Sequence, residues 1–366
     1  MTRAAVMRMQ KRKVLVLGEF GAFGRRIGAA LSRSPLVECL LGVDLRRKGA
    51  RRAREIGATV IPVDINDAAS MRRALDGVFA VVNTSGPFHA RDYRVAEACA
   101  DLGVHYVDPA ETREHVANIA QLARRAEKSG SLIVSGAAAV PAVSAALVDL
   151  MRGEFDRIGE IHTFVSPGRG DRREVAAVRA VLAYDGGPKR SRERGRARQR
   201  PETVHFPPPV GRRRGYLCAM PDLDLFPRRY GAQTVTCRIG PPTWFNRLVI
   251  AGLGRVRRRG LIENLPRAAA LLLRSGGPGL GRGRVGAGMR VLIHGQKGGQ
   301  PVSHSIYLMA RDASGPAISA APAIALVKQW VGRGVPQAGA MPAVGLLAWD
   351  DIKTELMGYD IVLVRA

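Results

Sequence analysis

The segment from residue 13 to residue 44 constrains the fold more than any other part of the sequence. An apolar run, Val14–Leu17, is followed by Gly18, Gly21 and Gly24, by a helix-like segment, and by a second apolar run that ends in an aspartate. Buried parallel strands are unbroken apolar runs because helices cover both of their faces. The order strand, glycine turn, helix, strand and acid predicts a dinucleotide-binding βαβ unit.

The three glycines and the closing acid suit the parts of a dinucleotide. Gly18 allows a tight turn that a β-carbon would obstruct, and Gly21 lets the backbone approach a pyrophosphate. The N–H groups at the start of the following helix meet the charge of that pyrophosphate. Gly24 lets the helix lie close to the sheet, and Asp44 can accept hydrogen bonds from a ribose diol.

The sequence leaves the choice between NAD and NADP open. Asp44 favours a free 2′-hydroxyl and repels a 2′-phosphate, which indicates NAD. Arg46 and Arg47 follow almost directly and could clamp that phosphate, which indicates NADP. The predicted cofactor is therefore NADP or NAD.

Further apolar runs alternate with helical segments, which gives six strands in all. This alternation predicts an α/β fold with a Rossmann-like parallel sheet, whose ligands bind at the carboxyl ends of the strands. The added strands are Thr59–Asp64, Val78–Asn83, Val104–Asp108 and Ser131–Val134, and a helix is expected over Ala110–Ser129.

The predicted cofactor-binding residues lie in the glycine turn and at these strand ends. Asp64 ends the third strand, where it is expected near the adenine; capping the next helix is the alternative. The predicted set is Gly18, Phe20, Gly21, Ala22, Phe23, Gly24, Asp44, Leu45, Arg46, Asp64, Ile65, Thr84, Ser85, Gly86 and Pro87.

Length and composition exclude several classes of protein. A chain of 366 residues that is 46% hydrophobic can form two domains, and it has no apolar run of membrane-spanning length. Residues 1–13 are basic but lack the apolar core and cleavage site of a signal peptide, so a cytoplasmic location is expected. The four cysteines and seven histidines show no metal-ligand spacing, and no metal is expected.

The net charge of +26 is mostly due to arginine. Such a charge can serve nucleic acid, an anionic membrane surface or acidic ligands. Aromatic residues make up only 5% of the chain and no nucleic-acid-binding motif is present, so no specific nucleic-acid partner is expected. Peripheral membrane contact through the basic clusters at 188–200 and 255–259 stays open.

Four motifs in order resemble the cofactor domain of the saccharopine dehydrogenase-like oxidoreductases. They are the glycine spacing from Gly18 to Gly24, the segment Val81–Phe88, the segment from Ala96 to Asp108, and Gly136–Ser144 with its internal proline. The resemblance implies a second α/β domain that supplies substrate contacts and often a dimer interface, followed by a segment that folds back. It implies a Rossmann domain at 12–140, a substrate and dimerisation α+β domain at 141–335, a returning segment at 336–366, and a homodimer.

The second half of the chain has a different pattern, typical of a mixed sheet. Helices are expected at Ala317–Gly332 and Trp349–Met357. Candidate strands are Ile161–Val165, Thr234–Ile239, Met289–Gly295, Ser303–Ala310 and Ile361–Val364, and loop compositions occupy Gly195–Arg200, Pro207–Pro209, Gly211–Gly215 and Gly276–Gly288.

Hydride transfer needs a polarised C=O or C=N group and a nearby proton source. No tyrosine begins a Tyr-x-x-x-Lys motif, and Cys99 has the apolar neighbours of a structural residue. Tyr106, Asp108 and Glu111 are the predicted acid–base residues because they lie at a strand end beside the cofactor. The alternatives are core packing for Tyr106 and helix capping for Asp108.

Two departures from the family pattern fall where a substrate would bind. Saccharopine reductases carry Pro-Tyr and Asp-Pro-Gly, whereas this chain has Pro87-Phe88 and Ala139–Ala142. True saccharopine is therefore doubtful as the substrate. The predicted function is hydride transfer between NAD(P) and a small C=O or C=N compound, which could be anionic. The alternatives are a non-catalytic NAD(P)-binding sensor and a membrane-peripheral reductase of a lipid-like substrate.

Overall fold

The computed structural model forms two compact units. The first comprises Met1–Val143 with Ala317–Met357, and the second comprises Ser144–Pro316 with Gly358–Ala366. The domain limits inferred from the family resemblance differ from these units in the placement of the last helices and strands, and they stay a prediction. The structure describes residues 11–18, 21–43, 59–86, 88, 92–168, 180–181, 184, 201–240, 286–311 and 314–366.

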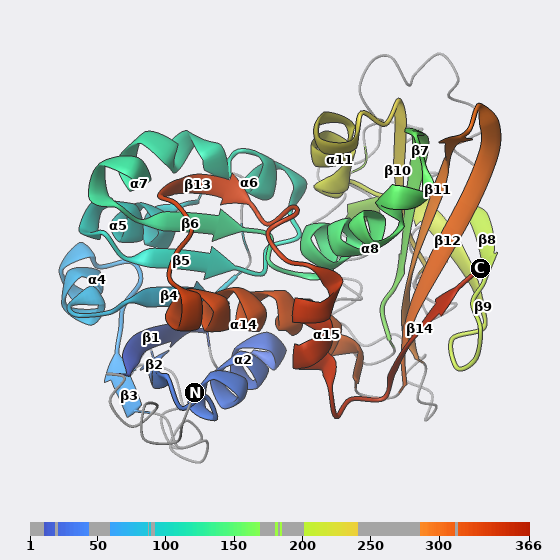
Figure 1. The fold of residues 1–366 in the computed structure, drawn as a ribbon. Coiled ribbons are helices and arrows are strands. Elements are labelled where there is room, and N and C mark those ends of the chain that lie inside the picture. Colours follow the sequence, from blue (N-terminus) through green and yellow to red (C-terminus); the bar gives the residue numbers. More distant parts are fainter. Residues whose placement is uncertain are drawn as a thin grey trace, which may run out of the picture. The chain divides into compact units, whose positions relative to one another are not determined.

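The first unit contains sheet A, a seven-stranded parallel sheet in the order β13-β6-β5-β4-β1-β2-β3 (Figure 1). Six of these strands follow the Rossmann order, which confirms the predicted fold class. The seventh, β13, comes from the last part of the chain. The strands are β1 (Arg12–Leu17), β2 (Val37–Val43), β3 (Thr59–Pro62), β4 (Ala80–Asn83), β5 (His105–Asp108), β6 (Leu132–Ser135) and β13 (Gly339–Pro342).

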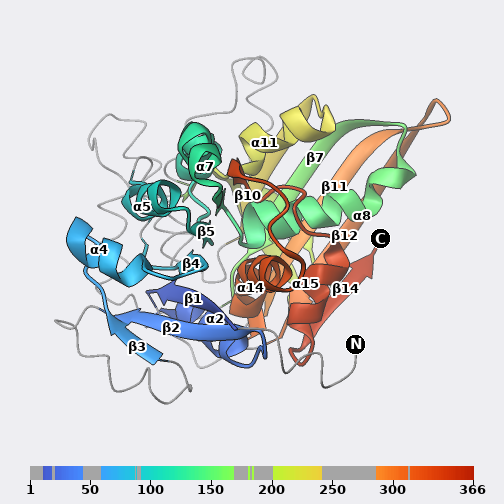
Figure 2. The same ribbon diagram turned by 60° about the vertical axis from the view of Figure 1, so that its left-hand side comes forward.

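Helices cover both faces of sheet A, so its strands are apolar on both sides. Figure 2 shows α4, α5 and α7 on one face and α2 with α14 on the other. The face under α4 and α5 packs Leu15, Val81 and Tyr106 against Met71 and Cys99. The helical segments are α2 (Ala22–Ser32), α4 (Ala68–Leu75), α5 (Arg94–Leu102), α6 (Arg113–Ala117), η2 (Ile119–Leu122), α7 (Ala123–Ser129), η3 (Ala139–Val143), α14 (Gly315–Arg333) and α15 (Trp349–Leu356).

One long helix was expected between β5 and β6, and that prediction is wrong in detail. The segment is split into α6, η2 and α7. The α-helical hydrogen bonding stops at Asn118, whose φ of −97° and ψ of 3° lie outside the helical region. Ile119 and Leu122 then turn into the core as a short 3₁₀ helix. Residues three apart are eclipsed in a 3₁₀ helix, so both apolar side chains point into the core together.

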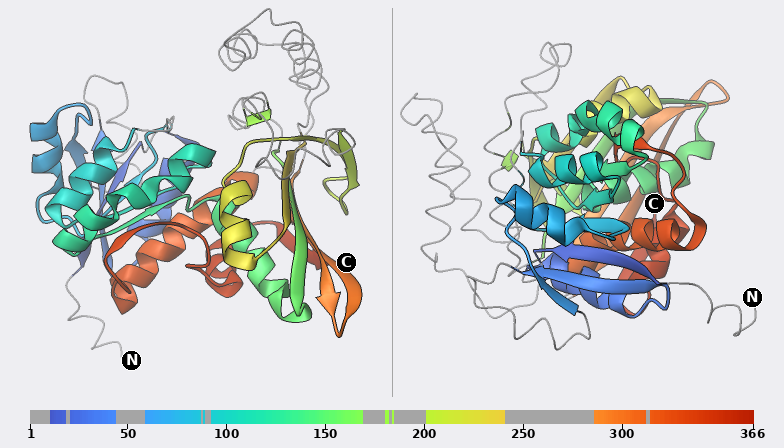
Figure 3. Two further views of the ribbon diagram at one scale, coloured as in Figure 1. Left: turned by 90° about the horizontal axis from the view of Figure 1, so that it is seen from above. Right: turned by 90° about the vertical axis from the view of Figure 1, so that its left-hand side faces the viewer.

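The second unit contains sheet B, a seven-stranded mixed sheet in the order β14-β12-β11-β7-β10-β9-β8. Among its described strands, only β7 and β10 pair in parallel, and helices α8 and α11 lie along one face (Figure 3). The elements are α8 (Ser144–Met151), η4 (Arg152–Glu154), β7 (Arg157–Ser166), β8 (Glu202–His205), β9 (Arg212–Leu217), α11 (Asp222–Tyr230), β10 (Thr234–Ile239), β11 (Ala287–Lys297), β12 (Gln300–Ala310) and β14 (Ile361–Arg365).

A loop was predicted at Gly211–Gly215. This prediction is wrong, because β9 runs through most of the segment. Arg213 sits half-buried and donates to Ser166 Oγ at 3.1 Å. Gly215 is buried against the ring of Phe164, where an added β-carbon would lie 2.2 Å from a ring carbon. The glycine therefore marks close packing between strands rather than a turn.

In the described parts of the chain, every helix is too short or not apolar enough to cross a bilayer.

Candidate functional site

The carboxyl edge of sheet A brings the ends of β1 and β4 into direct contact. Gly18 follows β1 with a φ of +81°, and an added β-carbon there would lie 2.6 Å from the backbone nitrogen of Ser85. Thr84 fixes the approach: its Oγ1 donates to Leu17 O at 2.7 Å and to Gly18 O at 3.1 Å. Only glycine can occupy position 18 without moving the turn after β4.

Helix α2 begins directly above this turn and has no side-chain cap. Its N-cap is Gly21, whose own N–H donates to Gly18 O at 3.0 Å. No acidic residue occupies the first turn. An uncapped helix start attracts an anion, since its N–H groups and dipole both favour negative charge. The glycine turn and this helix start therefore fit the pyrophosphate of a dinucleotide.

The other predicted cofactor residues divide into three groups. Phe23 and Gly24 lie on α2, half-buried and buried, and Ser85 and Gly86 continue the turn after β4. Ala22 is the first residue of α2, and only its backbone is described. Phe20, Asp44, Leu45, Arg46 and Pro87 lie outside the described residues.

Asp64 and Ile65 lie in the turn after β3, where both are half-buried. The carboxylate of Asp64 accepts from the backbone N–H of Asn66 at 3.0 Å, and its own N–H donates to Ser70 Oγ at 3.0 Å. Asp67 is the residue that caps α4, through bonds to Ala69 N and Ser70 N. Asp64 therefore orders the turn but is not the capping acid.

A chain of buried hydrogen bonds joins the ends of β4 and β5. Asn83 Nδ2 donates to the Tyr106 hydroxyl at 3.2 Å, and that hydroxyl donates to Asp108 Oδ2 at 3.0 Å. Asn83 Oδ1 accepts from Ser85 N at 3.1 Å and from Ser85 Oγ at 2.6 Å. The Asn83 amide thereby connects the turn after β4 with the Tyr106–Asp108 pair.

Asp108 is fully buried and gathers donors from three segments. Its Oδ1 accepts from Ala110 N at 2.9 Å, from Ser135 Oγ at 2.9 Å and from Gly136 N at 3.1 Å. His115 Nε2 lies 3.4 Å from the other carboxylate oxygen. Buried carboxylates persist only with such partners, so this one holds the ends of β5 and β6 in register.

Burial governs the ionisation of the tyrosines near this carboxylate. Desolvation, and then the charge of Asp108, holds the pKa of Tyr106 well above its usual range. The same two causes raise the pKa of Tyr93 to about 12, and its hydroxyl donates to the carbonyl of His115 at 2.8 Å. Both phenols are neutral donors at physiological pH.

Two of the three predicted acid–base residues are buried in the core. Tyr106 is 1% exposed and Asp108 is 0% exposed. Glu111 lies in the turn before α6 and is half-buried. The structure thus brings Tyr106 and Asp108 into contact and leaves part of the Glu111 side chain accessible.

Sequence reasoning missed Asn83, Ser135 and His115 as members of this network. Asn83 and Ser135 each end a buried strand, and polar residues at that position were an available signal. His115 lies on a short helix with no pattern that marks it. Within the described residues, no group of three metal-ligating side chains occurs.

Comparison with known proteins shows which family this architecture resembles. Residues 14–134 match the family model described as the saccharopine dehydrogenase NADP binding domain, which confirms a nicotinamide dinucleotide as the cofactor class. A search of curated protein sequences found no match for the chain.

Three solved structures resemble the whole chain in fold. Apo saccharopine dehydrogenase (L-Glu forming) from Saccharomyces cerevisiae has a TM-score of 0.62 at 11% identity, over 97% of this chain and 100% of that one. An engineered D-amino acid dehydrogenase bound to NADP⁺ gives 0.51 at 14%, over 94% and 99%. Homospermidine synthase from Legionella pneumophila in complex with NAD gives 0.58 at 11%, over 98% and 91%.

At these identities the structural neighbours show the fold alone, and the family model matches only residues 14–134. The resemblance stated from the motifs is therefore confirmed. Residues 14–134 match the model of the saccharopine dehydrogenase NADP binding domain, and the chain as a whole has a fold like that of saccharopine dehydrogenase.

Proposed function

We propose that this protein is an oxidoreductase that transfers hydride between NADP or NAD and a small substrate with a C=O or C=N group. The observation that carries the proposal is the contact between Gly18 and the turn after β4, below the uncapped start of α2. The match to an NADP-binding domain and the saccharopine dehydrogenase-like fold support it.

Different residues at the carboxyl edge would contact different parts of the bound dinucleotide. Gly18 and Gly21 leave room for the pyrophosphate, and the first turn of α2 supplies N–H donors. Ser85, held by Asn83 Oδ1, fixes the turn that would border the cofactor. When bound, the nicotinamide supplies or accepts the hydride.

The proton must come from a group that the substrate can reach. Tyr106 and Asp108 are buried and fully engaged, so their proposed role is to position the strand ends. Glu111 is partly accessible and lies three residues beyond β5. Among the predicted acid–base residues, Glu111 is therefore the proposed proton carrier.

The substrate is proposed to be small and different from saccharopine. The sequence departs from saccharopine reductases at Phe88 and at Ala139–Ala142, beside the strand ends. Phe88 packs against His115 with ring centroids 5.3 Å apart, so an apolar ring lies where those reductases carry a phenol. A homodimer, as in the family, is part of the proposal.

Two measurements test the proposed function. A fluorescence titration with NADPH and NADH tests the cofactor site and shows which dinucleotide is preferred. Oxidation of the bound reduced cofactor is then followed with a panel of oxo acids, imines formed from amino acids, and lipid carbonyls. Binding with turnover of one class supports the enzyme. Binding without any turnover would favour the sensor, and failure of both dinucleotides to bind would refute the proposal.

A further inference from the structure

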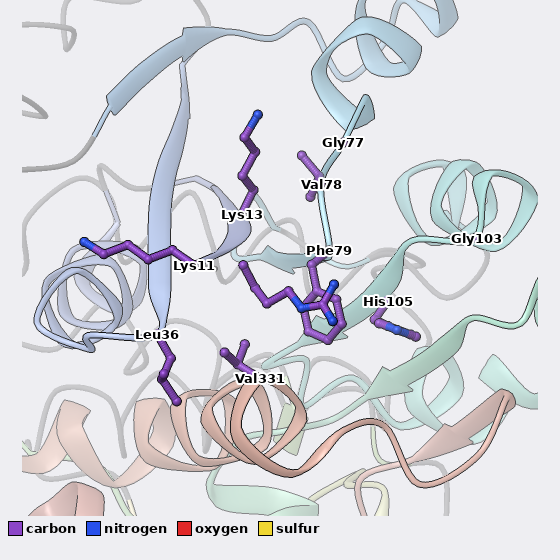
Figure 4. A pocket seen from close by; sticks show the side chains of 10 residues that line it. Lys11, Lys13, Leu36, Gly77, Val78, Phe79, Gly103, His105 and Val331 are labelled. Carbon is purple, nitrogen blue, oxygen red and sulfur yellow. The ribbon is translucent and has the colours of Figure 1, made fainter. Parts of the chain in front are cut away.

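A hollow of about 700 Å³ opens at the amino-terminal edge of sheet A. Its lining comes from the starts of β1, β4 and β5 and from α14, all in the first compact unit. Figure 4 shows Phe79 and His105 side by side, with Lys11 and Lys13 extending away from them. Gly18 and Asp108 lie at the opposite ends of the same strands, so the hollow is separate from the cofactor site.

The lining carries three basic side chains and no acidic one. Lys11, Arg12 and Lys13 are consecutive and exposed, and none forms a salt bridge with any described residue. Neighbouring like charges repel each other, and a bound anion relieves that repulsion. The flexible stems of the two lysines allow both amino groups to turn toward such an anion.

Arg12 is ordered by an aromatic ring. Its guanidinium lies 5.2 Å from the centroid of the Phe79 ring, and that ring meets His105 edge-on at 4.9 Å. The start of β4 is tied to β1 by a bond of 2.9 Å from Phe79 N to Lys13 O. Stacking occupies one face of the guanidinium and leaves its N–H edge able to hold two oxygens of a phosphate.

His105 contributes a neutral donor. The backbone N–H of Leu132 donates to His105 Nδ1 at 3.0 Å, so the proton of the neutral ring is on Nε2. Burial, and then the charge of Arg12, lowers the pKa of His105, which keeps the ring neutral at physiological pH. Among the described residues, no acceptor takes the Nε2 proton.

We propose that this hollow, the amino-edge site, binds a small phosphate compound with at least two negative charges. Three cations and one neutral donor suit several phosphate oxygens at once, and the volume exceeds that of a single ion and suits a metabolite. A single-stranded nucleic acid suits it less, because Arg12 already covers the half-buried ring of Phe79.

The test is calorimetric titration of the full chain with pyrophosphate, with a sugar bisphosphate, and with citrate as a polycarboxylate of similar charge. Arg12→Gln removes the ordered cation, and Lys13→Gln removes a flexible one. Arg124→Gln, an exposed arginine on α7 away from the hollow, is the matched control. NADPH is titrated into every variant, because pyrophosphate could also enter the glycine turn.

The expected result is that Arg12→Gln weakens binding of a phosphate probe at least about tenfold, and Lys13→Gln by about threefold. Arg124→Gln leaves both affinities unchanged, and no variant changes the NADPH affinity. The relative affinities of pyrophosphate and the sugar bisphosphate distinguish an inorganic from an organic ligand.

Three results would overturn the amino-edge site. Equal weakening by Arg12→Gln and Arg124→Gln would show general attraction to a basic surface. Citrate binding as tightly as the phosphates, with the same dependence on Arg12, would show the wrong ligand class. Displacement of pyrophosphate by a slight excess of NADPH would place it in the glycine turn. If Arg12→Gln lowers the melting temperature, Lys13→Gln decides the question alone.

Discussion

The two edges of sheet A are built from opposite kinds of group. At the carboxyl edge, Gly18 and the start of α2 present backbone, and the charge of Asp108 is buried among fixed donors. At the amino edge, Lys11 and Lys13 carry their charge on long side chains in water. The same strands can therefore carry fixed polar groups at one edge and flexible charged side chains at the other. Substitutions at the first should alter folding or cofactor binding, whereas substitution of the exposed lysines at the second should leave both nearly unchanged.

The largest expected effect is on folding at the carboxyl edge. Asp108→Ala removes the acceptor of Ala110 N, Gly136 N and the Ser135 hydroxyl, and should lower the free energy of unfolding by about 3–5 kcal/mol. Urea denaturation measures it. Asp101→Ala, which breaks an exposed pair with Arg125, should cost less than about 1 kcal/mol. Equal losses would mean that the buried carboxylate does not stabilise this edge.

The next effect is on the cofactor. Gly18→Val would drive a side chain into the backbone of Ser85, and NADPH affinity should fall roughly 100-fold, or about 2.8 kcal/mol. Gly77→Ala is the matched control at the amino edge, because Gly77 also has a positive φ, +65°, but its nearest neighbour is Lys13 Nζ at 4.0 Å. This control should cost about 1 kcal/mol of stability and leave NADPH affinity unchanged. A Gly18 variant that is folded and binds NADPH normally would contradict the proposed site.

A third comparison separates positioning from proton transfer. Tyr106→Phe removes one donor from Asp108 and should lower the free energy of unfolding by about 1–2 kcal/mol, with kcat nearly unchanged. Glu111→Gln should lower kcat roughly 100-fold, as loss of a general acid does. Both are measured with the substrate class found in the turnover panel. The reverse pattern in kcat would make Tyr106 the proton carrier.

The smallest effect is a pH dependence at the amino edge. The pKa of His105 is lower in the folded protein than in the unfolded chain, so the folded state binds fewer protons. Its contribution to stability is present above about pH 6.5, the unfolded value, and is lost as the pH falls toward the folded pKa. His105→Gln should reduce this loss. Denaturation at pH 7.5 and pH 5 compares this variant with the unsubstituted protein, and an equal loss in both would contradict the assignment.

How much the sequence predicts differs between the two sheets. The first six strands of sheet A and the glycine turn follow from local patterns, because each strand is an apolar run and each helix follows at once. The strand β9 was not predictable, since arginines and glycines usually indicate a loop, and only contact with Phe164 shows why Gly215 is there. Strand β13 was also missed: it is four residues long, ends in a proline and pairs with β6 from far along the chain.

The candidate site shows the same limit. Gly18, Thr84 and Ser85 were recognisable because their spacing and their place after strands carry the signal. The network of Asp108 depends on contacts such as Ser135 to Asp108, which join residues 27 positions apart. No local pattern encodes such a pair. The sequence therefore located the carboxyl edge, but the burial that supports the proposed positioning role of Asp108 is visible only in the folded structure.

Residues 339–365 supply an outer strand to each sheet, since β13 pairs with β6 and β14 pairs with β12. A ribosome makes this stretch last among the described elements. Until it emerges, β6 and β12 each expose an unpaired row of backbone groups that could recruit another nascent chain. Both sheets are therefore completed by the same late segment of the chain.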